Sequence, residues 1–273
     1  MWPFKRKSLL DSAMIDWMFD QAQWLLASHA HAAEFARAQL LPLSEKVFPM
    51  AGLEGHALAE HLFMLTKTYA GVATLPVTLI PLGDSGRFKA QGGGLFVQPK
   101  SGAAGTYRHV SGQIEISYDA TLVAVAADLV AVLAHELAHA ILDFGAADPP
   151  PGDPAFDEIR TDFTAIFLGF GLYTVQFRSD TRVQSPETAH EWRELFANYM
   201  SFREACFATA LFSAVRGVDK GLILRHAPAA AVGNFKRAFA DLDEHRAAVD
   251  ALKALAAQAG ALQSNSLRSA ARQ

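Results

Sequence analysis

Apolar residues in the N-terminal part of the chain have the spacing of amphipathic helices. One stripe follows Asp11 and Ser12, either of which can cap a helix, and a second stripe ends at Gly71. Residues three or four positions apart fall on one face of a helix, which then packs on a core. The stripes comprise Met14, Trp17, Met18, Gln21, Trp24 and Leu25, and then Leu58, Leu62, Leu65 and Tyr69. We therefore expect N-terminal packing helices.

Between residues 75 and 118 the pattern changes to short β-rich runs separated by glycine-rich turns. The runs are LPVTLIPLG, GGLFVQP and GQIEISY, and Tyr107 and His109 lie in the connection between the last two. Such runs, bounded by glycine, are typical of strands. They predict a small, mostly antiparallel sheet of three or four strands.

Helical spacing returns after residue 120. One helix is expected to end near Phe144, before the proline-rich run AADPPPGDP. Asp153 followed by Pro154 predicts the start of the next helix, which contains Glu158 and runs toward Tyr173.

The remainder of the chain is also predicted to be mainly helical. Ser201 and Glu204 have the spacing of a capping box, and the helix they start is expected to end near Gly217. Two further helical segments are expected between about 229 and 258. Residues 261–273 are rich in Ser, Ala, Arg and Gln and are predicted to form a disordered tail.

The motif His135-Glu136-x-x-His139 stands inside the apolar run VLAHELAHAI. A spacing of four puts both imidazoles on one helix face, where they can bind one metal ion. Glu136, one step round the helix, then reaches a water on that metal, as in zinc hydrolases. A buried helix whose histidines only hydrogen-bond to neighbours is the alternative, although such groups are costly to bury without a function.

A catalytic zinc needs a third protein ligand and leaves its fourth position for water. The metzincin pattern HExxHxxGxxH is excluded, because Leu142 and Gly145 stand where its glycine and third histidine belong. Glu158-x-x-x-Asp162 follows 19 positions after His139, on the next predicted helix. An ordinary solvated helix face is the alternative for this pair. The same stripe, however, continues with Ala165 and Gly169, small residues that let a helix approach a neighbour closely.

This order of motifs resembles that of the gluzincins, the thermolysin-like class of zinc peptidases. The resemblance implies a Zn²⁺ ion bound by His135, His139 and Glu158. It further implies that Glu136 is the general base and that Asp162 holds the ring of His135. A carboxylate on the second nitrogen of a ligating imidazole fixes its tautomer and raises its basicity, which agrees with that role.

A longer resemblance covers most of the chain. The segments VFPMAG, GQIEISY, HELAHAIL and EIRTDFTAIFLGFG are similar to those of a family of uncharacterised bacterial HExxH proteins. This resemblance implies a metal site and a zincin-like fold, and it says less about the reaction. The expected fold is thus α+β: a small sheet packed on the HExxH helix, N-terminal packing helices and a helical C-terminal lobe.

The predicted activity is that of a zinc-dependent peptidase acting on a peptide or protein substrate. In gluzincins an edge strand of the sheet binds an extended peptide, and one of the predicted strands is expected to do the same unless the sheet is purely structural. A peptidase also needs a donor for the tetrahedral oxyanion. The candidates are Tyr199 and His190, followed by Arg178 and Tyr173.

Two other functions remain open. One is a catalytically silent zinc-binding scaffold with a regulatory or interaction role. The other is a carboxylate-bridged di-iron protein, built from the Glu-x-x-His pairs at 136–139 and 187–190 with Glu60 and Glu158. The di-iron hypothesis leaves His135 unexplained.

Length, charge and cysteine content set limits on these hypotheses. The 273 residues can bury a substantial core, and we expect one domain over 1–260, divided into 1–74, 75–176 and 177–260. A net charge of −4 predicts no nucleic-acid partner. The chain has a single cysteine, Cys206, and its N-terminus is unlike a secretory signal. Its apolar runs are too interrupted to cross a bilayer. These features predict a cytoplasmic protein without a transmembrane segment.

Overall fold

The computed structural model describes residues 7–82, 104–144, 148–150, 156–180 and 199–270, and it has a mixed α+β architecture that is mostly helical. Helices α1 (Ser12–Ala27), α2 (Ala32–Arg37) and α3 (Gly55–Tyr69) come first. Strands β1 (Val77–Leu82), β2 (Gly105–Val110) and β3 (Gln113–Asp119) form one sheet. The short helix η1 (Ala120–Ala124) then leads into α4 (Ala126–Asp143).

The helical elements after α4 form the rest of the molecule. They are α5 (Asp157–Ala165), η3 (Ile166–Phe170), α6 (Gly171–Asp180), α8 (Phe202–Val215), α9 (Lys220–His226), η4 (Ala229–Ala231), α10 (Val232–Glu244) and α11 (Arg246–Ala270). No helix in the described part of the chain is long and apolar enough to cross a membrane.

The predicted N-terminal helices are present, with some differences in detail. Asp11 is the N-cap of α1 and accepts a hydrogen bond from the Met14 backbone at 2.9 Å. In α3, Leu58 and Leu62 are buried as expected. Tyr69, expected on the same stripe, is instead 38% exposed, and its hydroxyl donates to the Val47 carbonyl.

The sheet is mixed, so the prediction of a mostly antiparallel sheet is wrong. Its order is β1-β3-β2, with β1 parallel to β3 and β2 antiparallel to β3. Strand β2 contains Tyr107 and His109, which were expected in a connection. A two-residue turn joins β2 to β3, and its residues Ser111 and Gly112 both have positive φ, as a tight hairpin requires. The predicted strand GGLFVQP lies outside the described residues.

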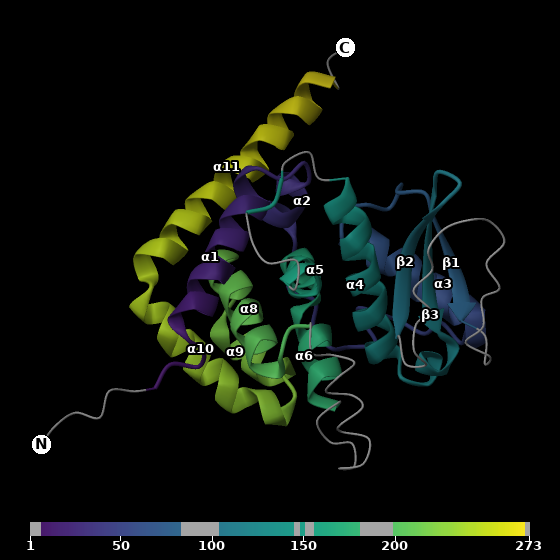
Figure 1. The fold of residues 1–273 in the computed structure, drawn as a ribbon, viewed down its shortest axis with the longest axis horizontal. Helices are drawn as coiled ribbons and strands as arrows, with labels where there is room; N and C mark the ends of the chain where they lie inside the picture. Colours follow the sequence, from purple (N-terminus) through teal and green to yellow (C-terminus); the bar gives the residue numbers. More distant parts are fainter. Residues whose placement is uncertain (1–6, 83–103, 145–147, 151–155, 181–198, 271–273) are drawn as a thin grey trace, which may run out of the picture.

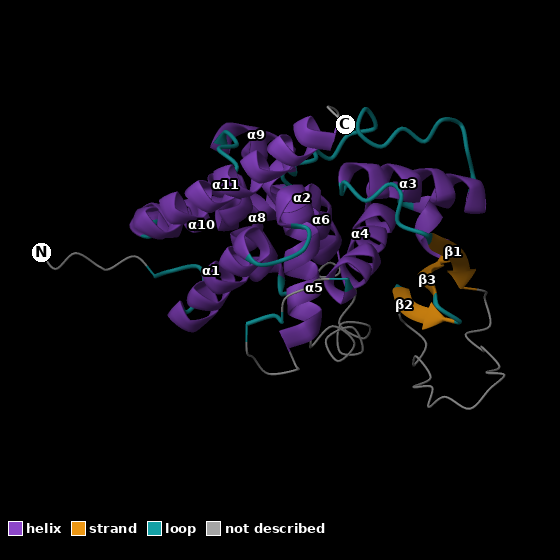
Figure 2. Ribbon diagram, turned by 90° about the horizontal axis from the view of Figure 1, so that it is seen from above, coloured by secondary structure: helices purple, strands orange, loops and turns teal. Residues whose placement is uncertain are grey.

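Helix α4 is the central element of the fold. It contacts β2, β3 and α3 on one side and α5 and α6 on the other, so it separates the sheet from the helical part of the molecule (Figures 1 and 2). Residues 129–138 are all buried. The HExxH motif therefore lies on an enclosed helix, where its side chains can be held by both layers.

The helix expected to run from Glu158 toward Tyr173 is interrupted. A π-helical turn, η3, separates α5 from α6, and Gly169 has a φ of 105° within it. A side chain at this position would collide with the carbonyl of Gln39, while the Gly169 carbonyl accepts a hydrogen bond from Leu41 at 3.0 Å. Gly169 thus allows a close approach, as predicted, but through a local bend rather than a continuous helix. The predicted cap at Asp153 and Pro154 lies outside the described residues.

The C-terminal lobe begins with the predicted capping box. Ser201 and Glu204 bond reciprocally at the start of α8, and Gly217 follows its end with a φ of 65°. Helices α10 and α11 are the two segments expected between about 229 and 258, and α9 precedes them. The expectation of a tail from 261 is wrong as far as Ala270, because α11 continues to that residue.

Candidate metal site

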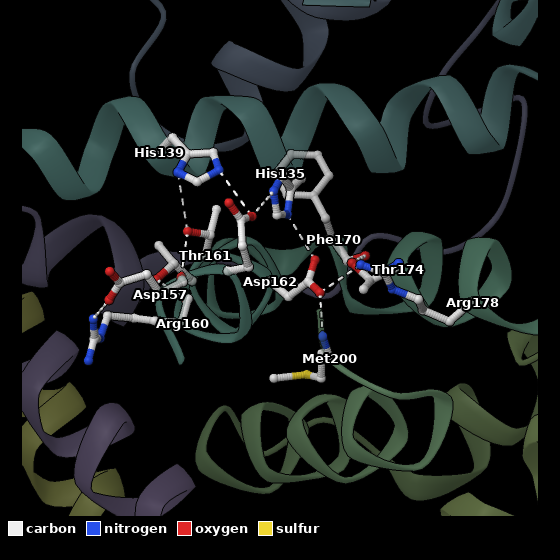
Figure 3. A network of polar contacts seen from close by, with 12 residues as sticks. His135, His139, Asp157, Arg160, Thr161, Asp162, Phe170, Thr174, Arg178 and Met200 are labelled. Carbon is white, nitrogen blue, oxygen red and sulfur yellow. Dashed lines mark hydrogen bonds and ion pairs between the residues drawn. The ribbon is translucent and has the colours of Figure 1, made fainter. Parts of the chain in front are cut away.

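Helices α4 and α5 bring the three predicted ligands together. The spacing of four residues on α4 turns His135 and His139 toward α5 (Figure 3). Glu158 of α5 lies close to both imidazoles. Oε2 of Glu158 lies 3.1 Å from Nε2 of His135 and 3.4 Å from Nε2 of His139. One candidate ligand atom from each residue lies within 4.8 Å of the others.

These residues fit a tetrahedral zinc ion. Zinc bonds of about 2.0–2.1 Å place two ligand atoms of a tetrahedron roughly 3.3 Å apart. Both measured separations, 3.1 and 3.4 Å, are close to this length. Two imidazoles and one carboxylate are also a common protein ligand set of catalytic zinc, which keeps a fourth position open.

Each histidine is held through the nitrogen that faces away from the candidate metal position. Nδ1 of His135 is 2.9 Å from Oδ1 of Asp162, and Nδ1 of His139 is 3.3 Å from the hydroxyl of Thr161. The Thr161 hydroxyl donates to the Asp157 carbonyl at 3.0 Å, so it can accept from the imidazole. Each Nδ1 can therefore donate to an oxygen, and the neutral tautomer that keeps this hydrogen bond has Nε2 as the atom that can bind a metal.

Asp162 joins the metal site to the C-terminal lobe. Its Oδ2 accepts hydrogen bonds from Arg178 at 2.7 Å and from the backbone N–H of Met200 at 3.0 Å. Burial alone would raise the pKa of Asp162, but Arg178, His135 and the Met200 N–H outweigh this effect and lower it. Asp162 is therefore an anion with partners on three segments of the chain.

The carboxylates also determine the charge of His135. Burial acts to lower the pKa of His135, but hydrogen bonds to Asp162 and Glu158 and their negative charges raise it to about 10. The pKa of Glu158 is lowered, because its bonds to the two histidines outweigh its burial. The carboxylates beside His135 thus favour a positive charge at this position.

Glu136 lies between α4 and β2 rather than among the ligands. It is 6% exposed, and its carboxylate has no hydrogen-bond partner among the described residues. Burial raises the pKa of Glu136, and the charges of His135 and His139 oppose that rise. A buried carboxylate without a fixed partner is suited to exchange protons.

The candidate oxyanion donors lie in different places. The ring of Tyr199 is 5.3 Å from that of His135, and its pKa is raised by burial and by the nearby charges of Glu158 and Glu136. Arg178 is bonded to Asp162 and packs over the Tyr199 ring at 5.0 Å. The hydroxyl of Tyr173 donates to the Pro42 carbonyl, which removes it as a donor at this site. His190 lies outside the described residues.

Sequence reasoning missed three contacts at the site. Thr161 is separated from Glu158 by three positions, and this spacing was a signal that its hydroxyl would face the same histidines. Gly105 at the start of β2 packs so closely on Glu136 that an added Cβ would lie 2.7 Å from Oε1. Tyr107 stacks on His139, with ring centroids 5.8 Å apart. The last two have no local signal, because they depend on where β2 crosses α4.

The di-iron arrangement finds no support in the described residues. Glu60 is on the surface of α3, where its side chain is 62% exposed and pairs with His56. The cluster instead includes His135, which a di-iron site would leave unused. Glu187 and His190 lie outside the described residues.

Comparison with known proteins identifies no relative: no family model, curated protein or solved structure matches the chain. The resemblance to gluzincins therefore rests on the order of motifs in the sequence.

Proposed function

We propose that the protein is a zinc-dependent hydrolase, and specifically a peptidase of gluzincin type. The observation that carries the proposal is the convergence of His135, His139 and Glu158 from two helices, with both imidazoles held through Nδ1. Two nitrogens and one oxygen favour zinc over magnesium or calcium, which prefer oxygen ligands alone.

The residues around the cluster have roles suited to peptide hydrolysis. A bound Zn²⁺ would supply Lewis acidity and lower the pKa of a coordinated water. Glu136, buried beside the cluster and without a hydrogen-bond partner among the described residues, would accept a proton from the attacking water and deliver it to the leaving amine. Tyr199, beside His135, would donate a hydrogen bond to the developing oxyanion.

The sheet offers a place for an extended substrate. Strand β2 pairs with β3 on one edge and has no partner strand on its other edge among the described residues. It also packs on α4, with Gly105 against Glu136. A peptide added to this edge would run beside the proposed metal site, so a peptide or protein is the expected substrate.

Metal analysis and a peptide-library digest test the proposal. Purified protein is expected to hold about one zinc per chain, and two irons would instead indicate the di-iron protein. The zinc-loaded protein should cleave peptides, whereas Glu136→Gln should retain zinc and lose cleavage by at least about 100-fold. Glu60→Gln, at an exposed glutamate, is the matched control and should behave as the wild type.

Two results would contradict the proposed peptidase. Undiminished cleavage by Glu136→Gln would remove Glu136 from the mechanism. Full zinc loading without cleavage of any peptide in the library would favour the silent zinc-binding scaffold instead.

A further inference from the structure

Beside the candidate metal site, residues of β2 and of the end of α4 form a small polar network with Tyr107 at its centre. The Tyr107 hydroxyl donates to Oδ2 of Asp143 at 2.8 Å and lies 2.6 Å from Nε2 of His109. His109 is also 3.4 Å from the same carboxylate oxygen. The phenol is therefore fixed at its far end by a helix residue and a strand residue.

The register of the two elements explains this arrangement. Gly105, Tyr107 and His109 alternate along β2, so they share one face of the strand. On α4, Glu136, His139 and Asp143 follow at spacings of three and four, so they form one continuous ridge. Contacts along this line join Gly105 to Glu136, Tyr107 to His139, and Tyr107 and His109 to Asp143.

His139 needs such support more than His135 does. The side chain of His135 is 10% exposed and is bound to the Asp162 carboxylate at 2.9 Å. The side chain of His139 is 26% exposed, and the partner of its Nδ1 among the described residues is the neutral Thr161 hydroxyl, at 3.3 Å. The Tyr107 ring lies nearly parallel to the His139 ring, at an angle of 14° and a centroid distance of 5.8 Å.

We propose that Tyr107 is a positioning residue for the metal site, which fixes the imidazole plane of His139 through its ring and is itself anchored by Asp143. This inference rests on the proposed metal site and adds an orienting residue outside the HExxH and Glu-x-x-x-Asp motifs. Tyr107 acts through His139 and not on a substrate, because its hydroxyl already donates to Asp143.

The test compares metal binding of the full chain with Tyr107→Phe and Tyr107→Leu. Phenylalanine keeps the stacked ring and loses the anchor, whereas leucine keeps apolar volume and loses the ring. Zinc affinity, measured by chelator competition, should fall a few-fold for Tyr107→Phe and about 10- to 100-fold for Tyr107→Leu. The visible spectrum of Co²⁺ bound in place of zinc should change most in the leucine variant, because it reports ligand orientation directly.

Two controls separate this role from a structural one. Arg108→Ala alters the same strand on its other face, where Arg108 pairs with Glu115, and should leave affinity and spectrum unchanged. Tyr69→Ala removes a tyrosine whose hydroxyl bonds to the Val47 carbonyl and not to a residue of the site, with the same expected result. Circular dichroism with and without chelator checks that each variant is folded, and Tyr107→Phe provides the folded comparison if leucine unfolds the protein.

The outcomes distinguish this inference from the proposed function. If the wild type binds zinc and both Tyr107 variants match it in affinity and Co²⁺ spectrum, the positioning role is wrong while the metal site stands. An equal loss in Arg108→Ala also overturns it, because the effect would then come from the strand as a whole. A wild type that binds no zinc overturns the site itself and this role with it.

Discussion

His29 and His135 are both buried histidines, yet their surroundings give them opposite properties. His29, between α1 and α2, is 4% exposed, and burial with the nearby charge of His31 lowers its pKa to about 4 despite the opposing charge of Glu34. His135 is 8% exposed, and its carboxylate partners raise its pKa to about 10 against the effect of burial. Burial alone favours a neutral imidazole, and only nearby anions reverse that preference.

The comparison also separates a packing histidine from a candidate ligand. Nδ1 of His29 accepts a hydrogen bond from the His31 backbone at 3.1 Å, and its ring packs edge-on against Trp24 and Phe35. His135 has a carboxylate at each nitrogen. An anionic surrounding, rather than depth, therefore marks the candidate metal ligand.

The largest expected effect is the loss of zinc affinity when His135 is replaced, compared with the replacement of His29. His135→Ala removes one of three proposed ligands and should weaken zinc binding by more than about 100-fold, beyond the usual effect of an outer-shell substitution. His29→Ala should leave the affinity unchanged. Chelator competition measures both, and equal affinities in the two variants would contradict the assignment of His135.

Acid titration tests His29 itself. Because its folded pKa of about 4 lies below the unfolded value near 6.5, the unfolded state binds the proton more strongly. Its neutral form therefore contributes stability above pH 6.5 that is lost as the pH falls toward 4, by about 3 kcal/mol at most. Denaturant unfolding of wild type and His29→Gln from pH 7.5 to 4.5 measures this. The two pH profiles should diverge below pH 6.5, and parallel profiles would contradict the lowered pKa.

Replacing Asp162 makes the surroundings of His135 more like those of His29. Asp162→Asn removes the anion bonded to His135 Nδ1, so zinc affinity should fall about 10- to 100-fold. It also breaks the buried ion pair between Asp162 and Arg178, which should lower the free energy of unfolding by roughly 3 kcal/mol. Asp250→Asn, at an exposed ion pair, is the control and should change neither quantity. Unaltered zinc affinity in Asp162→Asn would show that His135 does not depend on this carboxylate.

The smallest effect is expected at Gly105, where both histidines keep their partners. Gly105→Ala would push its Cβ into Glu136, so hydrolysis should fall about 10-fold while zinc affinity stays the same. The matched control is Gly233→Ala in α10, where an added Cβ meets nothing within 4 Å. Kinetic assays measure the rate of hydrolysis, and chelator competition measures the zinc affinity. A loss of zinc affinity in Gly105→Ala would show that β2 supports the ligands rather than Glu136.

The local part of the fold could be predicted because it depends on short-range signals. Capping by Asp11 and the Ser201 capping box need only neighbouring residues, and both are present. The sheet was predicted less well, because a parallel pairing of β1 with β3 depends on the path of the chain between them. Strand β2 was missed because its polar residues Arg108 and His109 conceal the strand pattern.

The sequence by itself determined which residues can serve as ligands. The spacing of His135 and His139 puts them on one face of any helix, and that of Glu158 and Asp162 does the same on the next helix. Only the tertiary structure decided that the two faces meet, that Thr161 bonds His139, and that β2 crosses α4 at Glu136. The physical reason is the sequence separation of the residues that interact. Helical periodicity depends on residues a few positions apart, whereas the packing of α4 against α5 and β2 depends on the burial of the whole core.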